Sequence, residues 1–336
     1  MLDRSRNALA PIAGCHAHDL VFVSNATTAV TTVLHNLDLQ PGDEILTNAH
    51  EYTACLNNAR DRARRSGASV VTADLPWPMP SEDAAHESIM SRVTERTRFA
   101  LISLITSSTG IRLPVERLIS DLNDRGIHTI LDAAHGPGCI PLKIDEWNAA
   151  WTTGNCHKWL FAPKGSAFLH VRRDKQVGFR PLVLSNDAER LEVATQRTQR
   201  PHWHHEFDYC GTDDATANIT IADAVEFIGS VVPGGIHAVI EQNHAMSLRA
   251  RNTICEELNV TPPVPDSMLG PMAAIELPAS SPDAAFVKDR LYREWRIQVP
   301  VWGTPAGRTV TRLSAQIYNT DEQYVYLAEA LRQITR

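Results

Sequence analysis

The chain has 336 residues, 43% of them hydrophobic, and a formal net charge of −7 at pH 7. This length and apolar content suffice for one large core and one smaller core. The acidic balance gives no electrostatic footprint for nucleic acid. The six cysteines form no CxxC pair, and we find neither a signal peptide nor an apolar run long enough for a membrane. We therefore expect a cytoplasmic protein that binds neither nucleic acid nor membrane.

Short apolar strands alternate with helical stretches in the first two thirds of the chain. In order, the predicted elements cover 20–24, 27–36, 44–47, 52–66, 68–73, 99–105, 115–125, 127–131, 150–153 and 165–171. This alternation is typical of βαβ units and predicts an α/β fold with a mostly parallel sheet.

The pattern breaks near residue 235, where a long helix over 236–258 begins. The later elements, predicted at 273–277, 284–295, 310–314 and from 321 onward, indicate a small α+β unit. We expect a large domain at 1–235, followed by a connecting helix and small C-terminal domain at 236–336.

The strongest functional signal is an acidic residue and a lysine that each follow a strand. Asp132 and His135 lie in Asp-Ala-Ala-His-Gly, and Lys158 lies in Gly-Asn-Cys-His-Lys-Trp after the next strand. Ligands bind at the carboxyl edge of an open parallel sheet. Pyridoxal 5′-phosphate (PLP) needs an amine for its aldehyde and an anion for its ring nitrogen. This pair therefore predicts a PLP site. Lys164 is the competing lysine, but its position between Pro and Gly indicates a loop.

The first strand-to-helix turn, Asn25-Ala26-Thr27-Thr28, is a candidate phosphate site. Free N–H groups at a helix start and the Thr27 hydroxyl can bind an anion. Taken alone, the segment could equally be an ordinary helix cap.

A histidine-rich segment, His202-Trp203-His204-His205-Glu206, could suggest a metal. Because no cysteine or carboxylate set at ligand spacing completes a tetrahedral site, we expect no metal. His202 and His204 could share one side of an extended segment, but we expect these side chains to line the active-site entrance, close to Gly211-Thr212.

Five motifs in family order resemble the class V aminotransferases of PLP fold type I, and within them the isopenicillin N epimerase-like branch. The motifs are Asn25-Ala26-Thr27-Thr28, Asp132-Ala133-Ala134-His135, Gly154 to Gly165, Gly211-Thr212 and Arg312 to Thr320. The resemblance implies a mostly parallel, seven-stranded central sheet flanked by helices, plus a small C-terminal α+β domain.

The resemblance also implies a role for each matching residue. Lys158 would bind the cofactor covalently, Asp132 would pair with its ring nitrogen, and His135 would contact its ring hydroxyl. Arg312 would bind the substrate carboxylate, as suits a planar bidentate donor. The other implied cofactor contacts are Ala26, Thr27, Tyr52, Ser107, Asn155 and His157. Tyr52 would stack over the cofactor and take part in catalysis, although it could also be a buried helix residue.

Gly211-Thr212 resembles a segment donated across a dimer interface, which implies a homodimer with shared active sites. The chain departs from the family at Asp213, where relatives often carry arginine. Relatives also carry a further segment ahead of the position that matches Met1. A non-enzyme alternative is therefore a PLP-binding protein that lacks turnover.

The sequence leaves several reactions possible on an amino-acid-type substrate. Epimerisation needs proton exchange on both faces of the carbanion, with Lys158 on one face and Tyr52 or water on the other. Elimination at a carbon–sulfur bond needs only one face. Residues 297–312 contain no cysteine that could accept a persulfide, which disfavours desulfuration. We expect an epimerase; the alternatives are a carbon–sulfur lyase, of cysteine desulfurase-like or sulfoxide lyase type, and an aminotransferase.

Overall fold

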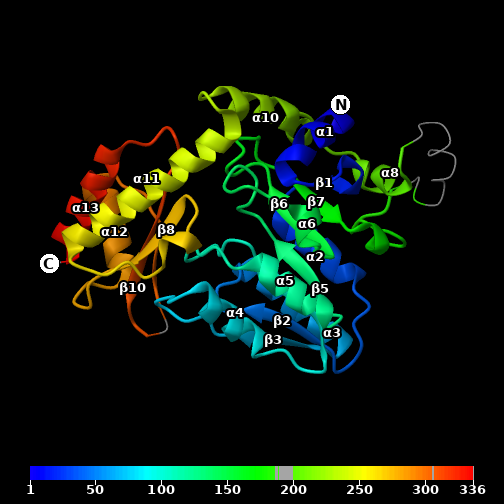
Figure 1. Cartoon of the computed structure of the whole chain (residues 1–336), viewed down its shortest axis with the longest axis horizontal. Helices are drawn as coiled ribbons and strands as arrows, with labels where there is room; N and C mark the ends of the chain where they lie inside the picture. The colour runs from blue at the N-terminus through cyan, green and yellow to red at the C-terminus, as the bar shows by residue number, and fades with distance from the viewer. Residues whose placement is uncertain (186–187, 189–199, 305, 336) are drawn as a thin grey trace.

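The computed structural model describes residues 1–185, 188, 200–304 and 306–335. Figure 1 shows a large body built on a central sheet and a smaller body at the C-terminal end of the chain. A long helix, α11 (Gly235–Leu258), runs from the large body to the small one.

The large body contains a seven-stranded sheet. Its strands are β1 (Leu20–Val23), β2 (Glu44–Asn48), β3 (Ser69–Ala73), β4 (Thr97–Ser103), β5 (His128–Asp132), β6 (Trp151–Asn155) and β7 (Ala167–Val171), in the order β1-β7-β6-β5-β4-β2-β3. The pairs from β3 through β2, β4 and β5 to β6 are parallel, whereas β7 is antiparallel to both β6 and β1. This confirms the predicted α/β fold with a mostly parallel, seven-stranded sheet.

Helices cover the sheet and link its strands. In the large body they are α1 (Leu2–Ala13), α2 (Ala26–Asn36), α3 (Thr53–Ser66), α4 (Glu82–Met90), α5 (Val115–Asp124), α6 (Ile144–Trp147), α8 (His202–Asp208), α9 (Thr216–Ile219) and α10 (Ile221–Ser230). α5 shows why such segments fold as helices. Its buried residues Val115, Leu118, Ile119 and Leu122 recur at helical spacing and form one apolar stripe.

Neighbouring residues in the central strands point into different cores. Ile130 belongs to one hydrophobic cluster and Leu131 to another, and the same holds for Leu101 and Ile102 in β4. Successive side chains of a strand face opposite sides of the sheet. Both faces are therefore covered, which explains why apolar residues follow one another directly in the middle of these strands.

The small body is an antiparallel sheet packed against helices. Its other elements are β8 (Met272–Glu276), α12 (Ala284–Trp295), β9 (Val301–Gly303), β10 (Thr309–Ser314) and α13 (Asp321–Thr335), with the strands in the order β8-β10-β9. Helix α13 packs against both α11 and α12 (Figure 1). In the described part of the chain, no single helix is long and apolar enough to cross a membrane; only the bent pair 216–230 and 235–258 passes by length and composition.

The histidine-rich segment is not extended. Residues 202–208 form helix α8, which begins after Pro201. Trp203 Nε1 and a ring nitrogen of His204 both hydrogen-bond the His18 carbonyl oxygen, at 3.1 and 2.9 Å. These side chains hold α8 against the turn before β1. They do not line the pocket described below.

Gly154 offers a test of how tightly this sheet is packed. A Cβ at this position in β6 would lie 2.5 Å from Cε1 of Phe168 and 2.8 Å from Cγ of Pro137. Because overpacking strains a core, we expect Gly154→Ala to lower the free energy of unfolding by about 1–3 kcal/mol, measured by urea denaturation.

Gly229→Ala is the matched control for this prediction. Gly229 lies in α10, and a Cβ there would meet nothing within 4 Å. Alanine favours a helix over glycine by up to about 1 kcal/mol, so this variant should be neutral or slightly stabilised. Equal losses in the two variants would contradict the packing argument.

Candidate active site

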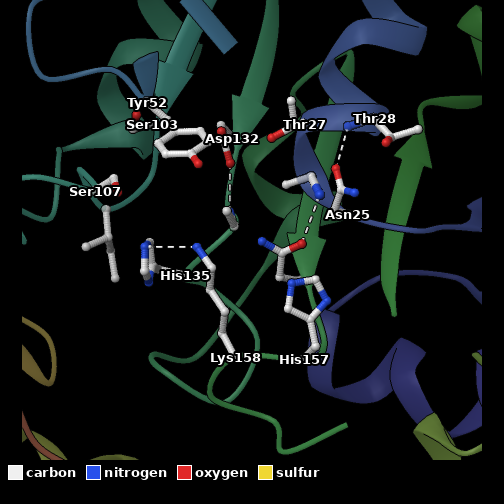
Figure 2. Close-up of a pocket in the computed structure, with 14 residues that line it drawn as sticks. Asn25, Thr27, Thr28, Tyr52, Ser103, Ser107, Asp132, His135, His157 and Lys158 are labelled. Carbon is white, nitrogen blue, oxygen red and sulfur yellow. Dashed lines mark hydrogen bonds between the residues drawn. The ribbon is translucent and has the colours of Figure 1, made fainter. Parts of the chain in front are cut away.

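A pocket of about 520 Å³ lies at the carboxyl ends of the central strands (Figure 2). It is lined by residues from the ends of β4, β5 and β6 and from the N-terminal ends of α2 and α3. The lining residues are Asn25, Ala26, Thr27, Thr28, Tyr52, Ser103, Ile105, Ser107, Asp132, Ala134, His135, Asn155, His157 and Lys158. The fold thus brings together most of the residues that sequence analysis proposed.

Asp132 is the anionic group at the floor of the pocket. It ends β5, and its side chain is buried. Its Oδ1 accepts the Ala134 N–H at 2.9 Å, and its Oδ2 accepts the Cys55 thiol at 3.4 Å. Burial raises the pKa of Asp132, while the Ala134 N–H and the nearby Lys158 charge oppose that rise. Its two oxygens are therefore held in fixed positions.

Lys158 reaches the pocket from the turn after β6. Its Nζ lies 3.1 Å from Nε2 of His135 (Figure 2). Although part of the side chain is exposed to the open pocket, desolvation lowers the pKa of Lys158, and the Arg312 charge lowers it further against the pull of Asp132. A lowered pKa favours the neutral amine, which is the nucleophilic form.

The start of α2 forms the opposite end of the pocket. The side chain of Asn25 accepts the Thr28 N–H at 2.8 Å, and Asn155 Oδ1 accepts the Ala26 N–H at 2.9 Å. Of the first three N–H groups of α2, that of Thr27 remains to bind a ligand. Asn155 also keeps its NH₂ group for a second partner. The positive helix end makes this part of the pocket suited to an anion.

His157 adjoins this anion end. Its Nδ1 lies 2.7 Å from the Ser166 carbonyl oxygen. A carbonyl oxygen only accepts, so Nδ1 carries the proton and Nε2 is the ring nitrogen left for the pocket. Burial lowers the pKa of His157.

Tyr52 and Ser107 complete the pocket on the side of α3 and β4. Tyr52 is the residue immediately before α3, and 48% of its surface is exposed. The alternative that it is a buried helix residue is therefore wrong. Figure 2 shows its ring across the pocket from Lys158.

Glu51 is a site residue that sequence reasoning missed. It is buried, and its carboxylate oxygen, an Asp132 oxygen and Cys55 Sγ all lie within 4.8 Å of one another. Glu51 accepts hydrogen bonds from the Ser103 hydroxyl at 2.7 Å and the Tyr52 N–H at 2.8 Å. Burial and the adjacent Asp132 carboxylate raise the pKa of Glu51 to about 8.

The two neighbouring carboxyl groups therefore differ in protonation state. Two buried carboxylates this close cannot both ionise at neutral pH. Asp132 accepts hydrogen bonds from the Ala134 N–H and the Cys55 thiol, which favour its anion, whereas the raised pKa of Glu51 keeps a proton on that group. Sequence reasoning also missed Ser103, although its position at the end of a parallel strand, like that of Asp132, could have indicated a site residue. No local feature of the sequence marks Glu51.

Three proposed residues lie outside this pocket. Gly211 and Thr212 occupy an exposed loop between α8 and α9. Arg312, on β10, lines a second pocket of about 420 Å³. Its Nε is buried without a hydrogen-bond partner among the described residues. A guanidinium group whose Nε is buried without a partner is suited to an anionic ligand.

The donor set of the main pocket fits PLP. Asp132 supplies an anion for the ring nitrogen, Lys158 an amine for the aldehyde, and α2 with Asn155 and His157 a site for the phosphate. These groups lie at different ends of one cavity, as such an elongated ligand requires. Lys164, the competing lysine, lies in an exposed turn and does not line the pocket.

Comparison with family models and known proteins agrees with the resemblance seen in the sequence. The family model described as aminotransferase class-V matches residues 1–325. The chain is 31% identical to the isopenicillin N epimerase of Streptomyces clavuligerus, with 100% of this chain and 85% of that protein covered. It is 26% identical to the putative L-cysteine desulfhydrase 2 of Oryza sativa subsp. japonica, with coverage of 99% and 76%.

A solved structure shows the same fold. The apo cysteine desulfurase from Thermococcus onnurineus superposes with a TM-score of 0.80 at 18% identity, covering 99% of this chain and 83% of that one. The similarity extends over both bodies of the molecule.

The raised pKa of Glu51 predicts a pH-dependent stability. The folded protein keeps a proton up to about pH 8 that the unfolded chain, with a pKa of 4.5, releases earlier. The stability that Glu51 contributes at low pH is therefore lost as pH rises through this window. Glu51→Gln cannot ionise, so in urea unfolding without cofactor it should gain stability relative to wild type between about pH 5 and pH 8.

Glu44→Gln is the control with the opposite sign. Burial alone would raise the pKa of Glu44, but hydrogen bonds from Thr94 and Arg96 lower it overall. The contribution of Glu44 is present above its unfolded pKa and is lost on acidification. Glu44→Gln should therefore be least stable relative to wild type at neutral pH. Parallel profiles for the two variants would contradict the assignment of the proton to Glu51.

Proposed function

The chain belongs to the aminotransferase class-V family, whose members are PLP enzymes, and from this premise we propose that it acts at the α-carbon of an amino acid or a derivative of one. We propose epimerisation as the reaction. The observation that carries this proposal is the placement of Lys158 and Tyr52 in one pocket with Asp132. The greater identity to an isopenicillin N epimerase than to a cysteine desulfhydrase supports it.

Bound PLP would act as an electron sink that acidifies the substrate Cα–H. Asp132 would supply the anion that a protonated ring nitrogen needs, and His157 and the start of α2 would hold the phosphate. Desolvation lowers the pKa of Lys158, which favours the neutral amine, and the Nζ of that form can accept a proton at Cα. Arg312 has a guanidinium Nε without a partner in the described structure, and it binds the substrate carboxylate.

Epimerisation requires a second proton donor on the face opposite Lys158. Tyr52 is the titratable side chain that lines the pocket across from Lys158 (Figure 2). Its phenol can donate and accept a proton. Tyr52 therefore fills the role that distinguishes an epimerase from an enzyme that needs one face alone.

The cysteines argue against a persulfide mechanism. All six lie in the described part of the chain, and none lines the pocket. Burial raises the pKa of Cys55, Cys139 and Cys156, which lie near the site. Since the thiolate is the nucleophile, these groups are unreactive. A carbon–sulfur lyase that eliminates sulfide directly remains the second candidate, supported by the desulfhydrase relatives.

We also propose that the protein is a homodimer. The exposed Gly211 and Thr212 lie outside the pocket of their own chain, so they are free to complete the phosphate site of a partner. Each of the two active sites of the dimer would then contain residues of both subunits and bind the small-molecule substrate.

Cofactor binding is tested by absorbance. The protein incubated with PLP should show a visible band that borohydride removes, leaving the cofactor on the Lys158 peptide in mass spectrometry. Lys158→Ala should lack the band because it lacks the amine, whereas Lys164→Ala should retain it. A colourless wild-type protein under saturating PLP would contradict the proposal.

The reaction is tested by a screen of single-enantiomer amino acids in deuterated water. Wild type should incorporate deuterium at Cα and form the opposite enantiomer. Tyr52→Phe keeps the ring but loses the hydroxyl, so enantiomer formation should fall by about a hundredfold or more while Cα exchange continues. Chiral chromatography and NMR measure the two outcomes.

The control and the competing outcomes are distinct. Tyr292→Phe, on the exposed surface of α12, should match wild type. Release of pyruvate and sulfide without the opposite enantiomer would establish the lyase. A coloured protein that exchanges no Cα proton with any amino acid would favour the non-enzyme alternative.

A further inference from the structure

His135 is contacted at both ring nitrogens by neighbouring residues of one turn. Trp159 Nε1 lies 3.2 Å from His135 Nδ1, and Lys158 Nζ lies 3.1 Å from His135 Nε2. His135 and Trp159 are both buried. The three side chains thus form one hydrogen-bonded chain that ends at the amine facing the pocket.

The direction of this chain follows from the donors. An indole N–H can only donate, so Nδ1 of His135 must be the acceptor. A neutral imidazole then carries its proton on Nε2, and this N–H points at the Lys158 amine. The amine can accept only through its lone pair, which the neutral form alone possesses. The contact with Trp159 therefore selects both the tautomer of His135 and the neutral state of Lys158.

We propose that Trp159 is a positioning residue that, through His135, keeps the Lys158 amine neutral and ready to react. The role of a reactive amine rests on the proposed function, but the tautomer of His135 does not depend on that function. Without the indole N–H, Nδ1 could take the proton. Nε2 would then accept from an ammonium group and stabilise charged Lys158.

The backbone holds Trp159 in this position. A Cβ at Gly138 would lie 2.6 Å from the Trp159 carbonyl oxygen, and Gly138 has φ +76°. The loop that carries His135 and the turn that carries Lys158 are therefore in direct contact. The indole ring also belongs to the main hydrophobic cluster.

The surrounding charges act in the same direction. Burial lowers the pKa of His135 well below 6.5, and the Arg312 charge and any charge on Lys158 lower it further. An imidazolium would also place an Nδ1–H against the indole N–H. Both effects keep His135 neutral.

The first test is the tautomer of His135, read from ¹⁵N chemical shifts of histidine-labelled protein without cofactor. The His135 signals are assigned by their absence in His135→Gln. Wild type should show the proton on Nε2 across neutral pH, and Trp159→Phe should show a mixture that titrates. A proton on Nδ1 in wild type would overturn the proposal, even if Trp159→Phe did not fold.

The second test is the pH dependence of PLP capture, followed as growth of the visible band. The net free energy of one hydrogen bond is equivalent to about one pKa unit. In Trp159→Phe the midpoint pH of PLP capture should therefore rise by about one unit, and capture at pH 7 should slow about tenfold. Trp203→Phe is the matched control, since it removes an indole N–H bonded to the His18 carbonyl oxygen.

The outcomes separate this inference from the proposed function. Equal pH profiles for Trp159→Phe, Trp203→Phe and wild type would overturn the role of Trp159. Failure of every variant to capture PLP, together with the expected tautomer in wild type, would reject the proposed function and leave the hydrogen-bonded chain intact.

Discussion

Burial of several ionisable groups in one pocket is the constraint on which the site depends. Asp132 and Glu51 are too close to ionise together, so one proton stays in the pair. On the other side of the pocket, Lys158, His135 and Arg312 repel one another's positive charge. The outcome is one carboxylate at the floor and one neutral amine at the wall. A PLP enzyme needs this combination.

The sheet explains why these groups meet. Asp132 and Ser103 end adjacent parallel strands, and Lys158 follows the end of a third, so all three reach the same edge. The rigid strands hold the floor of the site, while loops supply the groups above it. The close approach of Gly138 to Trp159 then joins the loop that carries His135 to the turn that carries Lys158. Arg312 comes from the small body, so the distance between its guanidinium group and the pocket depends on how the two bodies pack.

Much of the fold and part of the site could be predicted from local patterns. The alternation of strands and helices, the cap at Asn25 and the strand-end position of Asp132 are signals carried by neighbouring residues, and the structure has each of them. The histidine-rich segment was misjudged because its helix is stabilised by a distant partner, the His18 carbonyl oxygen. Strand β7 is antiparallel to both β6 and β1, and its pairing with β1 joins segments far apart in the chain.

By itself, the sequence determined the α/β fold, the family and the candidate pair Asp132 and Lys158, because strand periodicity and short motifs are local properties of a chain. Only the tertiary structure decided the protonation of the site. Glu51 acquires its raised pKa from burial beside Asp132, and His135 acquires its tautomer from Trp159 across a loop contact. Desolvation and hydrogen-bond direction depend on atoms brought together by folding, and no spacing along the chain encodes them.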